Sequence, residues 1–208
     1  MEANATFEQN LKREGATLQG FILTRQWRDS VVGQSLVYWL ATNDGPVRIE
    51  FPGQESVFFI PAFSILRAES VLAAQLKWRS ARVELRCFSE TDESAIARYF
   101  RNQRDLGLAR SLLQNHHIPA YEADIRPTDR YLIERFVQGT LEVSGDFNLA
   151  ENYLAAENPK IRKAPYAPRL SVVSLDIETS ISNGNIYSIA VDIDDARRVF
   201  MLGKPRLS

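Results

Sequence analysis

Cysteine is almost missing from this sequence, and long apolar runs are absent. The one cysteine, Cys87, excludes an internal disulfide framework and suits a reducing cytoplasm, and we expect it to be a small core residue in a strand. No apolar segment approaches the ~20 residues that span a bilayer, and residues 1–10 lack the charged-then-apolar pattern of a signal peptide. These absences predict a cytoplasmic protein with no membrane partner.

An excess of positive charge is missing too. The 208 residues include 25 Lys and Arg against 26 Asp and Glu, which gives a formal net charge of −1. Proteins that bind nucleic acids usually carry a basic footprint, because neutralising phosphates supplies much of their affinity. Any contact with DNA would therefore need a local basic patch, or parts of the protein outside this chain.

Strand patterns dominate the first third of the chain. Residues 1–17 have no convincing period and predict a flexible extension. After them, runs rich in β-branched and aromatic residues alternate with turns such as Asn43-Asp44-Gly45, which favours a tight hairpin. The predicted strands are 21–24, 35–42, 46–51 and 56–60. Together they predict an antiparallel meander that curls into a barrel-like sheet.

Mixed helix and strand patterns follow, so the predicted fold class is α+β. Residues 67–76 predict a helix, and the alternating run 78–88 predicts a half-buried strand. The next predicted elements are a strand over 95–100, a helix to Asn115, a strand over 118–125, a helix over 127–136 and a strand over 141–143. Residues 145–170 then lose periodicity around three prolines and predict an inter-domain linker.

Two carboxylates, Asp176 and Glu178, interrupt the strand-like segment 171–180. Side chains two residues apart on a strand share a face, and their Cα atoms lie roughly 6.5 Å apart. At an effective dielectric constant of about 20, two anions at that distance repel by about 2.5 kcal/mol. No Lys or Arg occurs from Leu170 to Tyr187 to offset this repulsion. A divalent cation is the natural partner, since hard cations bind carboxylate oxygens.

The alternative to a metal site is an exposed edge strand, where water screens the repulsion between the carboxylates. The surrounding pattern favours the metal site. Val173, Leu175 and Ile177 occupy the opposite face of the strand, which predicts packing against a core. Residues 182–185 then supply a turn, and residues 186–191 form a second predicted strand. The carboxylates therefore belong to a predicted β-hairpin.

Three blocks of the sequence resemble family B DNA polymerases. Leu175-Asp176-Ile177-Glu178-Thr179, followed after a short turn by residues 186–189, closely resembles the first exonuclease motif of that family. Residues 121–136 resemble a block that these polymerases carry before that motif, and residues 20–29 are similar to the start of the bacterial polymerase II branch. The blocks keep the family's order, and the resemblance runs from about Leu18 to the end of the chain.

The resemblance implies a domain organisation and a metal site. The N-terminal domain would cover residues 18–144, with an α/β part similar to an RNA-recognition unit, and residues 171–208 would begin an RNase H-like 3′→5′ exonuclease domain. In the family, the Asp and Glu of the motif are catalytic ligands of two metal ions. Asp176 and Glu178 would therefore bind Mg²⁺ or Mn²⁺, and Thr179 would lie near the primer-terminal nucleotide.

The resemblance also implies that more of the site lies elsewhere. The acids after Glu178, which are Asp192, Asp194 and Asp195, match neither of the two later exonuclease motifs of the family. The chain is therefore expected to be a piece of a longer protein and to be inactive alone.

The implied whole protein is a DNA-directed DNA polymerase with proofreading that acts in DNA replication and repair, in the cytoplasm at the nucleoid. Its partners would be primer–template DNA, a single-stranded 3′ end, the remaining polymerase domains and a sliding clamp bound by regions outside this chain. The alternative is a non-catalytic nucleic-acid- or protein-binding module, in which Asp176 and Glu178 only decorate a sheet.

A basic segment precedes the exonuclease-like motif. Lys160, Arg162, Lys163 and Arg169 place four positive charges in ten residues without an acid, and Tyr166 lies among them. Basic residues interleaved with an aromatic can follow a single DNA strand by charge and stacking. A solvated linker whose charges oppose aggregation explains the same pattern. Both interpretations stay open at this point.

Overall fold

The chain divides into two units, Met1–Pro168 and Arg169–Ser208. The computed structural model describes residues 12–83, 94–193 and 196–203. Cys87 and residues 1–11 lie outside the described residues, so the expected core role of Cys87 stays a prediction. No helix among the described residues is long and apolar enough to cross a membrane.

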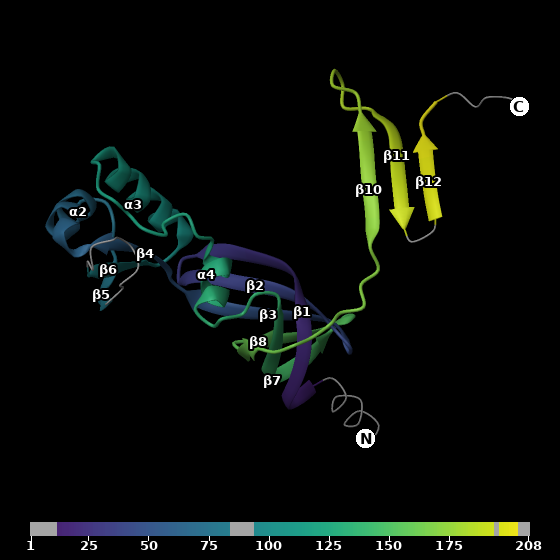
Figure 1. Ribbon diagram of the computed structural model, residues 1–208, viewed down its shortest axis with the longest axis horizontal. Coiled ribbons are helices and arrows are strands. Elements are labelled where there is room, and N and C mark those ends of the chain that lie inside the picture. Colours follow the sequence, from purple (N-terminus) through teal and green to yellow (C-terminus); the bar gives the residue numbers. More distant parts are fainter. Residues whose placement is uncertain (1–11, 84–93, 194–195, 204–208) are drawn as a thin grey trace, which may run out of the picture. The chain divides into compact units, whose positions relative to one another are not determined.

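A β-barrel forms most of the first unit (Figure 1). Its strands are β1 (Lys12–Ser30), β2 (Gly33–Thr42), β3 (Gly45–Gln54), β7 (Thr140–Ala150), β8 (Tyr153–Glu157) and β9 (Lys160–Lys163). The sheet order is β1-β2-β3-β8-β7-β9, and additional pairing of β1 with β7 closes it. β3 and β8 run parallel, whereas the other pairs are antiparallel. The five-stranded ring has the strand order of an OB-fold, a Greek-key barrel.

The long strand β1 closes the barrel because it pairs with two other strands. Its first half, Lys12–Phe21, pairs with β7, and its second half, Gly20–Ser30, pairs with β2. The register shifts twice, between Arg13 and Ala16 and between Ile22 and Thr24. Such bulges bend a strand and increase its twist, which lets one strand complete two sides of a barrel.

Alternating apolar residues of β2, β3 and β7 fill the barrel. The fully buried members of this core include Tyr38, Leu40, Ile49 and Phe147. Helix α4 (Pro127–Ile133) packs against β1 and β2 and adds its own residues to the same core. The hydroxyl group of Tyr38 donates a hydrogen bond of 2.8 Å to the Thr128 carbonyl oxygen, which ties the helix to the barrel.

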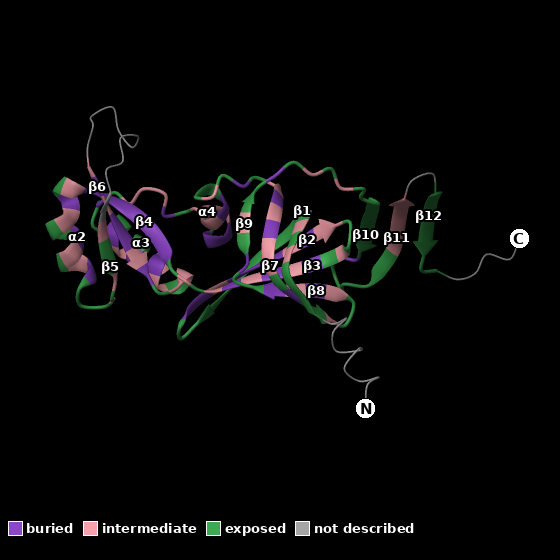
Figure 2. Ribbon diagram, turned by 90° about the horizontal axis from the view of Figure 1, so that it is seen from below, coloured by how far each residue is buried: buried purple, intermediate pink, exposed green. Residues whose placement is uncertain are grey.

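A second sheet, also in the first unit, has the order β4-β6-β5. Its elements are β4 (Ser56–Pro61), the 3₁₀ turn η1 (Ala62–Ser64), α2 (Ile65–Leu72), β5 (Arg79–Val83), β6 (Ala95–Phe100) and α3 (Gln103–Asn115). Both helices contribute to one apolar core with the sheet, which includes Phe58, Phe100, Leu72 and Leu113. Strand β4 is buried along its whole length (Figure 2).

Three expectations for this region need correction. Residues 56–60 form a strand, but it belongs to the second sheet and not to the barrel meander. Pro52 and Gly53 lie at a register shift near the end of β3, where Gly53 has a φ of +69°, and such a bulge bends a strand. The strand expected over 118–125 is reduced to a single bridge between Phe59 and Tyr121. The helix expected over 127–136 ends at Ile133 and packs on the barrel, since its apolar residues meet Tyr38 and the barrel core.

The predicted extension and linker are also shorter than expected. Residues 12–17 belong to β1 and pair with β7, so at most residues 1–11 remain of the extension. Most of the segment 145–170 is strand, because it contains the end of β7 together with β8 and β9. These strands are short, and Pro159 separates two of them, so their sequences carry little periodicity although their backbones complete the barrel.

The second unit is a three-stranded antiparallel sheet with the order β10-β11-β12. Its strands are β10 (Val173–Thr179), β11 (Ile186–Ile193) and β12 (Ala196–Met201). The predicted hairpin is confirmed. The prediction that Val173, Leu175 and Ile177 pack on a core is wrong, because they are 54%, 59% and 48% exposed, and no described residue of this unit forms a layer that buries them.

Candidate metal centre

Strand β10 places Asp176 and Glu178 on one face. Their partners on β11 are Ala190 and Ser188, and the register is unbroken from Val173 to Glu178. Because side chains alternate along a regular strand, the two carboxylates point the same way. Both residues are exposed, and β10 is an edge strand of its sheet (Figures 1 and 2). The pair therefore lies on an open surface that a substrate or a further protein segment can reach.

Neither carboxylate has a cationic partner among the described residues. Two basic residues, Arg197 and Arg198, line the same hollow as Asp176, and Arg197 is engaged elsewhere, because its Nε donates to Asp192 Oδ2 at 2.9 Å. Asp176 lines this shallow hollow of about 220 Å³ with Asp192 and Arg197. Within the described parts of the chain, no three His, Cys, Asp or Glu side chains gather as a metal site would require.

The two carboxylates fit a hard divalent cation only in part. Mg²⁺ requires six oxygen ligands in near-octahedral geometry and is commonly held by one or two carboxylates, waters and substrate phosphates. Asp176 and Glu178 can supply two oxygens and neutralise much of the charge. The described residues supply no third carboxylate, so the rest of the coordination shell would have to come from water, substrate or other protein segments.

Thr179 follows the pair at a change of register. The pairing shifts between Glu178 and Thr179, so Thr179 opposes Ile186. The next residue, Ser180, is buried, and its amide donates to the Asn185 carbonyl oxygen at 2.8 Å. The structure therefore places Thr179 beside the carboxylates, exposed, at the end of β10.

The basic segment does not form one patch. Lys160, Arg162 and Lys163 are exposed on the edge strand β9, but Arg162 Nε donates to Glu142 Oε1 at 2.7 Å, and this bond raises the pKa of Arg162. The Tyr166 hydroxyl group donates to Asn43 Oδ1 at 3.1 Å. Arg169 belongs to the second unit. One of the four cations is thus already paired, and Tyr166 is fixed to the turn between β2 and β3.

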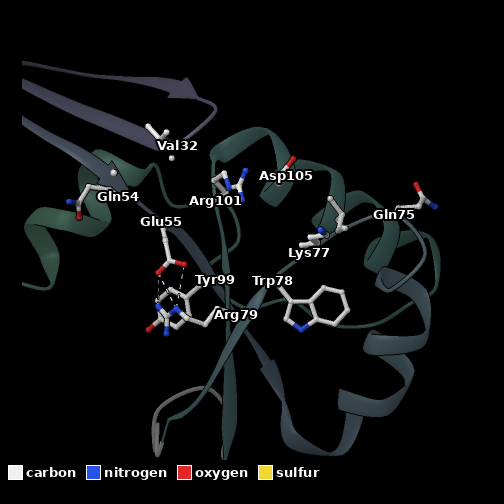
Figure 3. Close-up of a pocket in the computed structure, with 13 residues that line it drawn as sticks. Val32, Gln54, Glu55, Gln75, Lys77, Trp78, Arg79, Tyr99, Arg101 and Asp105 are labelled. Carbon is white, nitrogen blue, oxygen red and sulfur yellow. Dashed lines mark hydrogen bonds and ion pairs between the residues drawn. The ribbon is translucent and has the colours of Figure 1, made fainter.

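A groove that the sequence patterns did not indicate lies in the first unit (Figure 3). It encloses about 600 Å³ and is lined by the β1–β2 turn, the end of β3, the segment before β5, and residues of β6 and α3. Arg79 donates to both carboxylate oxygens of Glu55, at 2.6 and 3.2 Å for Oε2 and 3.4 Å for Oε1, and its guanidinium lies 3.8 Å from the centre of the Tyr99 ring. The lining residues are far apart in sequence, so no local motif marks the groove.

A family profile and a solved structure both relate this chain to DNA polymerases. A family profile described as "DNA polymerase II, N-terminal" matches residues 20–55, which include the second half of β1 and all of β2 and β3. The structure resembles that of the family B DNA polymerase from the hyperthermophilic archaeon Pyrobaculum calidifontis, with a TM-score of 0.63 over 89% of this chain and 27% of that one. At 18% sequence identity this likeness establishes the fold alone.

A curated relative adds the sequence relationship. DNA polymerase II of Escherichia coli (strain K12) is 37% identical over 185 residues, which cover 88% of this chain and 23% of the relative. The chain corresponds to the N-terminal region of a family B DNA polymerase. The chain spans about a quarter of the length of the curated relative that it matches.

Proposed function

We propose that this chain is part of a DNA-directed DNA polymerase with a 3′→5′ proofreading exonuclease, and that Asp176 and Glu178 are ligands of the editing site's metal ions. One observation supports the exonuclease role. Two carboxylates share an exposed face of an edge strand, without a cationic partner among the described residues. The polymerase relative supports the broader function, which would serve DNA replication and repair.

The chemistry assigned to the two carboxylates is electrostatic. Bound Mg²⁺ or Mn²⁺ would supply an activated water and charge stabilisation for hydrolysis of the terminal phosphodiester. Asp176 and Glu178 would bind the divalent ion at the sheet surface, because the repulsion between the two carboxylates is relieved when a cation lies between them. Thr179, exposed at the end of β10, would lie against the terminal nucleotide of a single-stranded 3′ end.

The proposal extends to the surrounding parts. The α/β alternation that begins at Ser94 would belong to the RNA-recognition-like unit of the N-terminal domain, and β10–β12 would open the RNase H-like exonuclease domain. The remaining polymerase domains, primer–template DNA and a sliding clamp bound elsewhere would be its partners, at the nucleoid in the cytoplasm. Lys160, Lys163 and Arg169 would add weak contacts to DNA phosphates.

A nuclease assay on the full-length polymerase tests the metal-ligand role. With Mg²⁺ and a labelled single strand, Asp176→Ala and Glu178→Ala should each lower the single-turnover cleavage rate by at least ~100-fold, with polymerisation retained. Ser174→Ala is the matched control, because Ser174 lies on the same face of β10 and carries no charge. Cleavage that survives either carboxylate change would refute the role.

The same assay on this chain alone tests whether the site is complete. Because no third ligand gathers among the described residues, we expect neither polymerisation nor cleavage from the chain. Cleavage by the chain that Asp176→Ala abolishes would contradict this expectation. If the chain is instead a non-catalytic binding module, cleavage by the full-length protein does not depend on Asp176, and Asp176→Ala would leave it unchanged.

A further inference from the structure

Helix α2 and the 3₁₀ turn before it expose two large apolar side chains on one face. Phe63 and Leu66 are 70% and 78% exposed. They lie three residues apart and are therefore neighbours on the helical surface, and Arg67 follows on the same face. The opposite face of α2 carries Ala68 and Leu72, which are buried in the core that α2 shares with α3 and the sheet. Phe63 and Leu66 thus form an apolar pair outside that core.

The apolar pair adjoins the C-terminal end of α3. The Arg67 guanidinium donates a hydrogen bond to the His116 carbonyl oxygen at 3.2 Å, and α2 packs against α3 (Figure 1). Immediately after His116, the chain borders a shallow hollow of about 450 Å³. The bond between Arg67 and His116 therefore joins the apolar pair to the hollow. We name the whole the α2–α3 surface, and its exposed members are Phe63, Leu66, Arg67, Arg110, His117 and Pro119.

Hydrogen bonds hold the rim of this hollow in place. The His117 amide donates to the Gln114 carbonyl oxygen at 3.1 Å, and the Ile118 amide donates to the Leu113 carbonyl oxygen at 2.9 Å. Ile118 is itself buried and anchors the segment that follows α3. The surface is thus formed before any partner binds, so a partner loses little entropy in ordering it.

Positive charge dominates the α2–α3 surface. Neither of the two segments that form it, residues 61–68 and 106–121, contains an Asp or a Glu. Its two arginines are exposed, and neither forms an ion pair among the described residues. The acids that come next in the sequence, Glu69 and Glu122, are each paired with an arginine outside the surface. The surface is therefore locally cationic, although the chain has a formal net charge of −1.

This combination of groups matches a protein partner. The cores of protein interfaces are rich in aromatic side chains and arginine, which supply most of the binding energy. Apolar anchors one helical turn apart are also a common way in which helices and amphipathic segments recognise each other. Nucleic acid fits less well, because single strands are bound by rows of cations with aromatic rings for stacking, and Leu66 offers no ring.

We propose that the α2–α3 surface docks an acidic segment of a partner protein that carries apolar anchor residues. The anchors would lie against Phe63 and Leu66, and the carboxylates would lie against Arg67 and Arg110. The surface uses none of the residues of the proposed metal site. Nucleic acid, a second copy of this chain and another part of the polymerase are the competing occupants, and the test separates them.

The experiment titrates the whole chain into short fluorescein-labelled Glu-rich peptides and follows fluorescence anisotropy at low salt. Each peptide carries one Phe and one Leu at a different spacing, and a matched panel has Gln in place of Glu. We expect the best Glu peptide to bind at least about fivefold more tightly than its Gln counterpart. Phe63→Ser/Leu66→Ser should weaken its binding about tenfold, and Arg110→Gln should weaken it about threefold.

Matched controls are available in the same unit. Val31 and Val32 in the β1–β2 turn are 86% and 78% exposed, so Val31→Ser/Val32→Ser removes a comparable apolar pair. Lys160→Gln removes an exposed charge from β9. Both controls should keep the wild-type affinity for the peptide, and thermal melts should show that every variant folds as the wild type does.

The proposal is overturned if no Glu peptide binds, if the Gln panel binds equally well, or if the control variants lose as much affinity as the surface variants. The full-length polymerase should bind the same peptide, and failure to do so would show that another part of the polymerase covers the surface.

Two further measurements address the remaining occupants. If oligo-dT binds more tightly than every peptide and the Phe63→Ser/Leu66→Ser variant loses that binding, the surface belongs to nucleic acid and the proposal is wrong. If sedimentation shows a dimer of the chain that the same variant abolishes, the occupant is a second copy. None of these outcomes bears on cleavage by the full-length polymerase, so this proposal and the metal-ligand role fail separately.

Discussion

Arg98 offers a test in which removing the exposed partner of an ion pair should cost more than removing the buried one. Its side chain on β6 is 1% exposed, and its guanidinium donates to Glu69 Oε1 on α2 at 2.7 Å and also to the Ser80 hydroxyl oxygen on β5. Glu69 is 43% exposed. Burial lowers the pKa of Arg98, because desolvation outweighs the attraction of Glu69.

Replacing Glu69 by Ala leaves a buried guanidinium without its counter-charge. Breaking a fully buried pair in this way costs about 3–5 kcal/mol. Since Glu69 is partly exposed, water can take its place, and we expect a loss of about 2 kcal/mol. Arg98→Met removes the buried charge, keeps much of the apolar volume and leaves Glu69 solvated, so its cost should be within about 1 kcal/mol.

Urea unfolding followed by tryptophan fluorescence measures both values. Trp78 is a local reporter, because the Arg98 guanidinium lies 5.9 Å from its ring centre. Glu55→Ala is the control, since it removes the carboxylate of the surface pair with Arg79, which should change stability less than Glu69→Ala does. The reasoning is refuted if Arg98→Met is more destabilising than Glu69→Ala, or if Glu69→Ala matches the wild type.

Two further predictions concern the same unit. Phe136 follows α4 with a φ of +55° and is 81% exposed. Because glycine adopts this conformation without strain, Phe136→Gly should raise the free energy of unfolding by about 0.5–1 kcal/mol. A lower free energy of unfolding, measured by urea denaturation, would contradict this. The hydrogen bond from Ser35 lowers the pKa of Glu50, and the hydrogen bond and positive charge of Arg48 lower it further, although burial opposes both. The stability that Glu50 adds is present above its unfolded pKa of about 4.3 and is lost as the pH falls through the lower folded pKa. Thermal melts of wild type and Glu50→Gln should therefore differ at pH 7 and converge below pH ~4, and a constant difference would be evidence against the assignment.

Local sequence patterns predicted those elements that are specified by residues close together in the sequence. The Asp44-Gly45 turn and the alternation in residues 35–51 sufficed for β2 and β3, and the turn at 182–185 sufficed for the β10–β11 hairpin. The shared face of Asp176 and Glu178 follows from the two-residue period of a strand, so the sequence alone placed the pair.

Long-range pairing could not be predicted in the same way. β3 pairs in parallel with β8, and β1 closes on β7, so the paired segments lie more than a hundred residues apart in the sequence. The sequences of the short strands β8 and β9 do not indicate which strands they pair with. The engagement of Asp192 by Arg197 depends on the register of β11 with β12. The groove beside Val32 and Trp78 likewise exists only once the barrel and the second sheet are assembled.

The central claim is that Asp176 and Glu178 contact metal ions directly, and a change of ligand chemistry tests it most directly. In the full-length polymerase, Asp176→Cys should lose exonuclease cleavage in Mg²⁺ and regain part of it in Mn²⁺, because a thiolate is a poor ligand for Mg²⁺ and a better one for the softer ion. Ser174→Cys should cleave equally well with either metal. Equal loss in both metals, or no loss in Mg²⁺, would contradict the claim.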